Sequence, residues 1–229
     1  VKAILLPFRA ASGVYASDGR SKTFDVSGDG FGRSEGAGAV LLNSRSGEPE
    51  AYLLGSSVHS GGRGASLTAP NGSAHSSAIE LALARASMTE DGVGFLHPQG
   101  LGSNLADAIE ANGSLAKAHG SSKGLLVACH KANAGHSEAA SGLLAIATVE
   151  QFGRHAPANA QLRVLNPLIA ELANRLARAT VFATQGSFKD AESCGITAFG
   201  ISGTVAHTIL QLHGKSCDRD WQSRWLEAV

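Results

Sequence analysis

Apolar residues recur along the chain in short runs, and their spacing alternates between helical and extended patterns. From residue 73 to 87 they fall three and four positions apart, which predicts a helix with Ser73 as its N-cap. Short strands are predicted at 93–97 and, with the sequence GLLVAC, at 124–129, with a second helix at 103–118. Strands and helices in this order, separated by glycine-rich turns, indicate an α/β domain.

The flanking segments complete the predicted fold. Residues 36–43 and 51–59 have the pattern of two strands joined by a polar turn, which predicts a hairpin. The helix predicted over 137–152 is apolar on nearly every side, as expected for a helix packed within a protein. A closing strand at 180–184 and a hairpin over 194–212, interrupted by a glycine cluster, follow.

Composition and charge exclude several classes of partner. The chain has 19 basic and 19 acidic residues, so its zero net charge gives no reason to expect nucleic acid or an anionic membrane. No apolar run reaches the roughly 20 residues that span a bilayer. Three cysteines without CxxC spacing argue against a disulfide framework and a zinc site, which favours a reducing compartment, the cytoplasm, with a plastid as the alternative. The chain begins with Val1 on an apolar stretch, so we expect it to be a fragment.

Five glycine-rich segments occur in a definite order between residues 1 and 212. They are SDGRSKTFD at 17–25 continuing to EGAG at 35–38, LTAPNG at 67–72, GLGSNLADAIE at 100–110, KANAGHSEAASG at 131–142 and FGISGTVAH at 199–207. They resemble the SPDGRCKTFD, LTAPNG, GTGTxLGDPIE, KSNIGHxEAASG and FGFGGTNAH motifs of the β-ketoacyl synthases, particularly the ketosynthase domains of modular polyketide synthases. Each motif alone is a weak signal, but five in the family's order are a strong one.

This resemblance implies a thiolase-like layered αβαβα fold, of which the chain carries mainly the C-terminal half of the duplicated domain. Residues 1–50 would end the N-terminal half, 51–212 would form the C-terminal half, and 213–229 would be a linker or tail. The family's nucleophilic cysteine would lie upstream of Val1, so the fragment alone should be inactive. The implied reaction is decarboxylative Claisen condensation of acyl and malonyl thioesters in polyketide or fatty acid biosynthesis.

The resemblance also implies partners and site residues. Substrates would be carried on the phosphopantetheine of an acyl carrier protein, with no cofactor bound directly, and the domain would need its missing N-terminal half and form a homodimer. His136 would donate an imidazole N–H to the enolate oxygen, a role that preorganised donors fill in such sites. Lys131 would tune the histidine network. Glu138 would belong to the same site, or would simply be a favourable charge near a helix N-terminus.

The main departure from the family is Gln99, which stands where a second histidine precedes GTGT. A glutamine amide can donate a hydrogen bond, but it cannot carry a proton or a positive charge. His97 lies two residues earlier, on the same side of a strand, but would have to reach around Pro98 to substitute. Gln99 therefore predicts impaired extension.

Other positions are milder departures. Ser103 keeps a hydroxyl at one threonine position that contacts the phosphopantetheine arm, whereas Leu101 loses the other. Gly200 and Ile201 would line the acyl site, where a backbone N–H serves as half of an oxyanion hole. The remaining histidines show no metal-ligand spacing with carboxylates, so no metal site is predicted.

Two other functions compete with extension. The first alternative is a ketosynthase-like domain that does not extend the acyl chain: it either transfers acyl groups unchanged or is a non-catalytic dimerising scaffold. A degradative thiolase is disfavoured because LTAPNG and KANAGH resemble the synthase branch. Cys129, Cys194 and Cys217 do not lie in nucleophile-like turns, so the sequence offers no replacement nucleophile.

Overall fold

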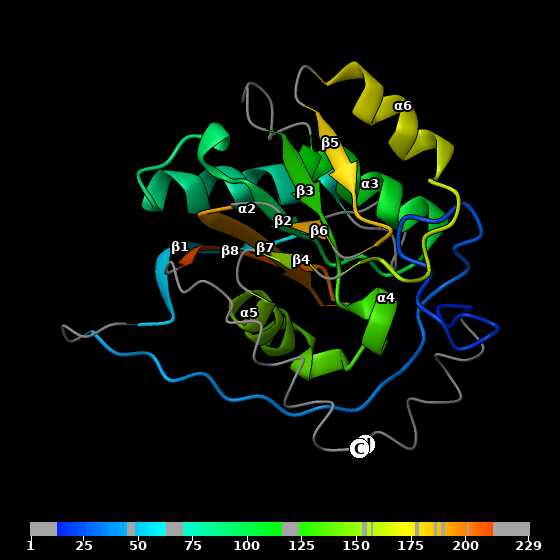
Figure 1. Ribbon diagram of the computed structural model, residues 1–229, viewed down its shortest axis with the longest axis horizontal. Helices are drawn as coiled ribbons and strands as arrows, with labels where there is room; N and C mark the ends of the chain where they lie inside the picture. Colours follow the sequence, from blue (N-terminus) through cyan, green and yellow to red (C-terminus); the bar gives the residue numbers. More distant parts are fainter. Residues whose placement is uncertain are drawn as a thin grey trace.

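A six-stranded mixed sheet forms the centre of the computed structural model, which describes residues 13–44, 49–62, 71–115, 124–152, 155–156, 158–176, 179–185, 187–188, 191–200 and 202–212 (Figure 1). The strand order is β1 (Ala51–Ser60), β8 (Thr204–Leu212), β7 (Ser193–Phe199), β2 (Phe95–His97), β3 (Leu125–Val127) and β5 (Thr180–Phe182). β1, β8 and β7 pair antiparallel, while β7, β2, β3 and β5 pair parallel. A separate two-stranded ladder joins β4 (His155–Ala156) to β6 (Ser187–Phe188).

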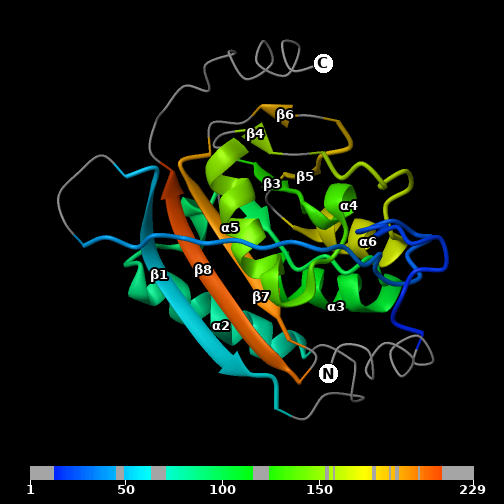
Figure 2. The ribbon, with the colours of Figure 1, turned by 90° about the horizontal axis from the view of Figure 1, so that it is seen from below.

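Helices cover both faces of this sheet. α2 (Gly72–Arg85) and α3 (Asn104–Leu115) lie on one face, and α5 (Ser141–Phe152) crosses the other, as Figure 2 shows. α6 (Pro167–Arg175) contacts α3, and the single turn α4 (Lys131–Ala134) follows β3. Two 3-10 turns, η1 (Glu90–Gly92) and η2 (Glu138–Ala140), precede β2 and α5. No helix within the described residues is both long and apolar enough to cross a membrane.

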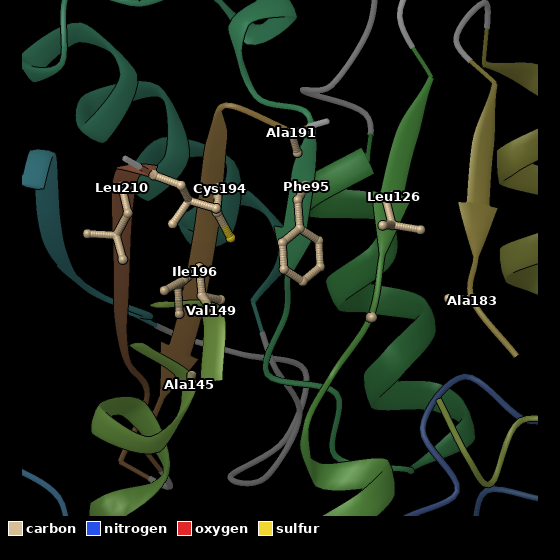
Figure 3. Packing of buried hydrophobic residues seen from close by; sticks show 11 residues of the cluster. Phe95, Leu126, Ala145, Val149, Ala183, Ala191, Cys194, Ile196 and Leu210 are labelled. Carbon is tan, nitrogen blue, oxygen red and sulfur yellow. The ribbon is translucent and has the colours of Figure 1, made fainter. Parts of the chain in front are cut away.

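Buried apolar side chains fill both layers, which explains why the parallel strands read as continuous apolar runs. On the α5 face, Phe95 of β2 and Ile196 of β7 pack with Val149 of α5 (Figure 3). On the other face, Leu125 and Val127 of β3 belong to a second cluster with residues of α3 and α6. Strand alternation therefore divides each strand between two cores.

Most predicted elements are present, with shifted ends. The helix predicted over 73–87 is α2, but its N-cap is Asn71 and not Ser73: the Asn71 side chain accepts hydrogen bonds from the amides of Ser73 and Ala74. The side-chain oxygen of Asn71 lies close enough to the unpaired N–H groups of the first helical turn to accept hydrogen bonds from them. The helix predicted from 137 begins as α5 only at Ser141, because η2 intervenes.

The predicted hairpin between residues 36–43 and 51–59 is wrong. β1 pairs along its length with β8, and residues 36–43 have no strand assignment. They run extended past α5 instead, where a Cβ added to Gly36 would lie 2.8 Å from the Leu144 Cδ1 atom. The absence of a side chain at Gly36 permits this close approach, and the more distal Leu41 is 92% exposed.

Candidate functional site

Gln99 and His136 meet at the carboxyl ends of the parallel strands β2 and β3. Their Nε2 atoms are 3.0 Å apart, and both side chains are buried, with 1% and 8% of their surface exposed. Gln99 follows β2 by two residues, and His136 follows β3 by way of α4. Carboxyl ends of parallel strands meet at one edge of a sheet, where ligands bind in open α/β folds.

The backbone around His136 fixes both its position and its tautomer. The His136 N–H donates to the Gly32 carbonyl (2.8 Å), and the Ser34 N–H donates to the His136 carbonyl (3.0 Å). The Glu138 N–H donates to Nδ1 of the His136 ring at 2.8 Å. Because Nδ1 accepts, a neutral His136 ring carries its proton on Nε2, which faces Gln99.

The Gln99 amide must therefore present an acceptor to His136. Two donors would oppose each other if the amide nitrogen faced the protonated Nε2 at 3.0 Å. In that orientation the Gln99 oxygen also has no hydrogen-bond partner, and the nitrogen makes only a long contact of 3.4 Å with the Phe199 carbonyl. Turning the amide by 180° puts the oxygen opposite Nε2–H and removes the conflict.

Two buried carboxyl groups of α3 hold the loop that carries Gln99. Glu110 accepts hydrogen bonds from the backbone N–H groups of Gln99 (2.6 Å) and Gly100 (2.9 Å). Asp107 accepts from the N–H groups of Gly102 (3.2 Å) and Phe24 (2.9 Å). Burial raises the pKa of both carboxyl groups to about 7, against the opposing effect of these hydrogen bonds.

Close packing explains the glycine at position 100. Gly100 has a φ of +54°, and an added Cβ would lie 2.6 Å from Thr23 Cγ2 and 3.0 Å from Cys129 Sγ. The Thr23 hydroxyl donates to the Gly100 carbonyl at 2.9 Å, so the loop is held from both sides. Only glycine fits this conformation and this space without strain.

His97 does not reach the site. Its Nε2 accepts from the His130 backbone N–H at 3.1 Å and lies 3.0 Å from Nδ1 of the His130 ring. Burial, with the nearby Lys131 charge, lowers the pKa of both His97 and His130. Lys131 itself is 1% exposed in α4, and its charge also lowers the pKa of the neighbouring Glu110 against the larger effect of burial.

The side chain and the backbone N–H of Glu138 contact different residues. Its carboxylate pairs with Arg33 Nε at 3.3 Å, while its amide binds His136. Glu138 also has a φ of +53°, a conformation that non-glycine residues rarely adopt. The strained backbone aims the N–H at the ring, and the charge of Glu138 plays no part in that contact.

Two of the three predicted substrate-binding residues, Ser103 and Gly200, lie in the described part of the chain. The partly buried Ser103 accepts the Asp107 N–H through its carbonyl at 2.8 Å, at the start of α3. Gly200 lies in the β7–β8 turn next to Phe199, and its N–H donates to the Thr204 carbonyl at 2.9 Å. Ile201 lies outside the described residues.

Neither described cysteine is suited to nucleophilic attack. Cys129 and Cys194 are fully buried, and burial raises the pKa of both thiols. The Cys129 thiol donates to the Gln99 carbonyl at 3.4 Å. Cys217 lies outside the described residues.

Sequence reasoning missed the roles of Asp107, Glu110 and His130. Asp107 and Glu110 are three residues apart on one helix, directly after a glycine turn, and this spacing puts both carboxyl groups on the face that the turn contacts. That signal was available in the sequence. The His97–His130 pair depends on the register of β2 against β3, which the sequence does not reveal.

Known proteins share this architecture. The solved oxazolomycin ketosynthase domain OzmH KS7 from Streptomyces albus JA3453 superposes with a TM-score of 0.81 at 28% identity, over 90% of this chain and 38% of that one. Polyketide synthase GfsA from Streptomyces halstedii is 35% identical over 86% of this chain and 3% of its own length. The 6-methylsalicylic acid synthase from Penicillium terrestre is 32% identical over 87% of this chain and 12% of its own length.

The sequence also matches two models of one family, which together span about two thirds of it. Residues 3–47 match "Beta-ketoacyl synthase, N-terminal domain", and residues 50–161 match "Beta-ketoacyl synthase, C-terminal domain". These matches and the structural likeness confirm the predicted ketosynthase resemblance and its thiolase-like fold. The chain belongs to the β-ketoacyl synthase family and covers the C-terminal part of a ketosynthase.

Proposed function

We propose that this chain is the histidine-bearing part of a polyketide synthase ketosynthase domain, which acts on acyl thioesters. The observation that carries the proposal is the buried His136, whose Nε2 proton is fixed by the Glu138 amide at the carboxyl ends of β2 and β3. A preorganised N–H in a water-poor site is the kind of donor that stabilises an enolate.

In the proposed reaction, the bond between the malonyl α-carbon and its carboxylate breaks, and carbon dioxide leaves. The electron pair forms an enolate, whose oxygen accepts a hydrogen bond from His136 Nε2. The enolate carbon then attacks an acyl thioester on the upstream cysteine, the carbon–sulfur bond breaks, and the cysteine thiolate is released. Loss of one such donor costs about 2.7–4 kcal/mol, or 10²–10³ in rate.

Acyl transfer without extension is a second candidate, favoured by the contact between Gln99 and His136. With the amide turned by 180°, the Gln99 oxygen would accept the Nε2 proton that the enolate needs, and the amide brings no positive charge to the site. Transfer between two thiols passes through a different oxyanion, which backbone N–H groups near Gly200 would stabilise. Decarboxylation would then be selectively weakened.

Two assays on the domain completed with its N-terminal half distinguish these functions. Exchange of a labelled acyl group with a carrier protein reports transfer, and release of carbon dioxide from a malonyl thioester reports enolate formation. Both activities support extension, and exchange alone supports transfer. If the acylated cysteine forms but neither activity follows, or if this chain alone yields β-ketoacyl product, the proposal is wrong.

The remaining assignments belong to the same proposal. Residues 1–50 would end the N-terminal half of the domain, residues 51–212 would form its C-terminal half, and 213–229 would be a linker or tail. An acyl carrier protein would present substrates on phosphopantetheine, and two copies of the completed domain would pair in the cytoplasm. The substrates would be polyketide intermediates, since polyketide synthase GfsA is among the named relatives.

A further inference from the structure

Three side chains of the types that bind metal ions lie together near the Gln99–His136 site. They are His97 at the end of β2, and Cys129 and His130 between β3 and α4. In the described part of the chain they form one group whose ligand atoms all lie within 4.8 Å of one another. All three are buried, with 0%, 0% and 5% of their surface exposed.

The ring nitrogens of the two histidines are nearly as far apart as those of two ligands of one metal ion. His97 Nε2 and His130 Nδ1 are 3.0 Å apart, and the rings stack with centroids 5.0 Å apart. Bonds of about 2.0–2.1 Å to nitrogen and 2.3 Å to sulfur separate neighbouring ligands of a tetrahedral zinc ion by about 3.3–3.6 Å. The cysteine sulfur therefore has to move by on the order of 1 Å to complete the set.

The geometry points to a Zn²⁺ site formed by His97 Nε2, Cys129 Sγ and His130 Nδ1, which ties the β2 loop to the β3–α4 loop. Zinc binding displaces the proton of the Cys129 thiol to solvent, and the His130 proton moves to Nε2, which has no partner in the described structure. The fourth position is filled by water or by the Gln99 carbonyl, to which the thiol already donates.

The site has a consequence for the loops above it. His97 precedes Gln99 by two residues, and His130 precedes His136 by six, so a bound ion links the two segments that carry those side chains. Zinc binding should therefore raise the thermal midpoint of the chain, since a ligand that binds only the folded state stabilises it. The inference is independent of the proposed enzymatic function.

Cobalt(II) titration of the 229-residue chain, with zinc competition, tests the site. The expected result is one equivalent of cobalt with a thiolate-to-cobalt charge-transfer band, displaced by zinc. Cys129→Ala should abolish the band and weaken zinc binding by at least about 100-fold, beyond the 10–100-fold effects of outer-shell changes. Cys194→Ala, at an equally buried cysteine whose sulfur is not part of this group of ligand atoms, and Cys217→Ser should leave both unchanged.

A second variant guards against misfolding of the first. His130→Asn keeps an N–H donor near the Nδ1 position, so the contact with His97 survives while a zinc ligand is lost. Folded His130→Asn protein, judged by circular dichroism, should lose the cobalt band. Absence of the band in folded wild-type chain, or its persistence in Cys129→Ala, would overturn the inference.

Discussion

Restoring a histidine at position 99 should increase malonyl decarboxylation in the completed domain. The loop backbone should not move, because Glu110 holds it through the N–H groups of residues 99 and 100. Histidine and glutamine have similar size, and the side-chain amide of Gln99 already lies 3.0 Å from His136 Nε2. Gln99→His therefore places a second ring nitrogen beside the first without a new cavity.

The expected gain follows from two changes. The Gln99 oxygen no longer competes for the His136 proton, a net hydrogen bond of about 1 kcal/mol. A new donor faces the enolate oxygen, and one such donor contributes about 2.7–4 kcal/mol. The substituted histidine will not be perfectly aligned, so an increase of about 10–100-fold is expected.

The assay measures carbon dioxide release from a malonyl thioester after the upstream cysteine has been acylated. Gln99→Asn is the matched control: it keeps the amide but is one methylene shorter, so it should give no gain. His136→Ala should lower the rate, and the double variant should be strongly non-additive because both groups act on one oxygen. An unchanged rate in Gln99→His with normal acylation would refute the reasoning, since His97 is held by His130 and cannot already fill the role.

Three further predictions concern the loop and the core. Glu110→Gln should lower the free energy of unfolding, measured by urea denaturation, by about 1–3 kcal/mol, because one of the two oxygens that accept buried backbone N–H groups is replaced by an NH2 group. The control Glu171→Gln, at an exposed position, should change it by less than about 0.5 kcal/mol. Gly100→Ala should cost at least about 1–3 kcal/mol, unlike Gly200→Ala, whose added Cβ would make only an ordinary contact, 3.9 Å from Ser202 Oγ. Burial lowers the pKa of His207 from 6.5 to about 4, so its contribution to the free energy of unfolding is complete above pH 6.5 and is lost as the pH falls towards 4. His207→Gln should reduce this loss of stability at low pH by up to about 3 kcal/mol. An unaltered dependence of stability on pH would contradict the assignment.

The sequence predicted elements well where one local rule decides them. The apolar run of β3 and the helical spacing of α2 correspond to observed elements. The predicted partner strand of β1 was wrong, because the alternation of apolar and polar residues indicates that a segment is a strand but not which strand it pairs with. Ser73 was chosen as N-cap over Asn71 because both residue types cap helices, and only the backbone path separates them.

The candidate site was predicted in part. The resemblance to the ketosynthase motifs implied that Gln99 and His136 belong to one site, and the structure has them in contact. Asp107 and Glu110 were missed as loop anchors because acidic residues on a helix usually face solvent, whereas here both are buried. The amide of Glu138 was missed because the sequence does not reveal a positive φ at a glutamate.

The way α3 secures the loop has a consequence for how this site can change. Glu110 accepts a hydrogen bond from the main-chain N–H of residue 99, and this bond does not involve the side chain of residue 99. The hydrogen bond that anchors the loop therefore does not depend on which side chain occupies that position, and two side chains of similar size, glutamine and histidine, can exchange without loss of this anchor. A single codon can in this way alter the proton chemistry of the domain while its architecture stays the same.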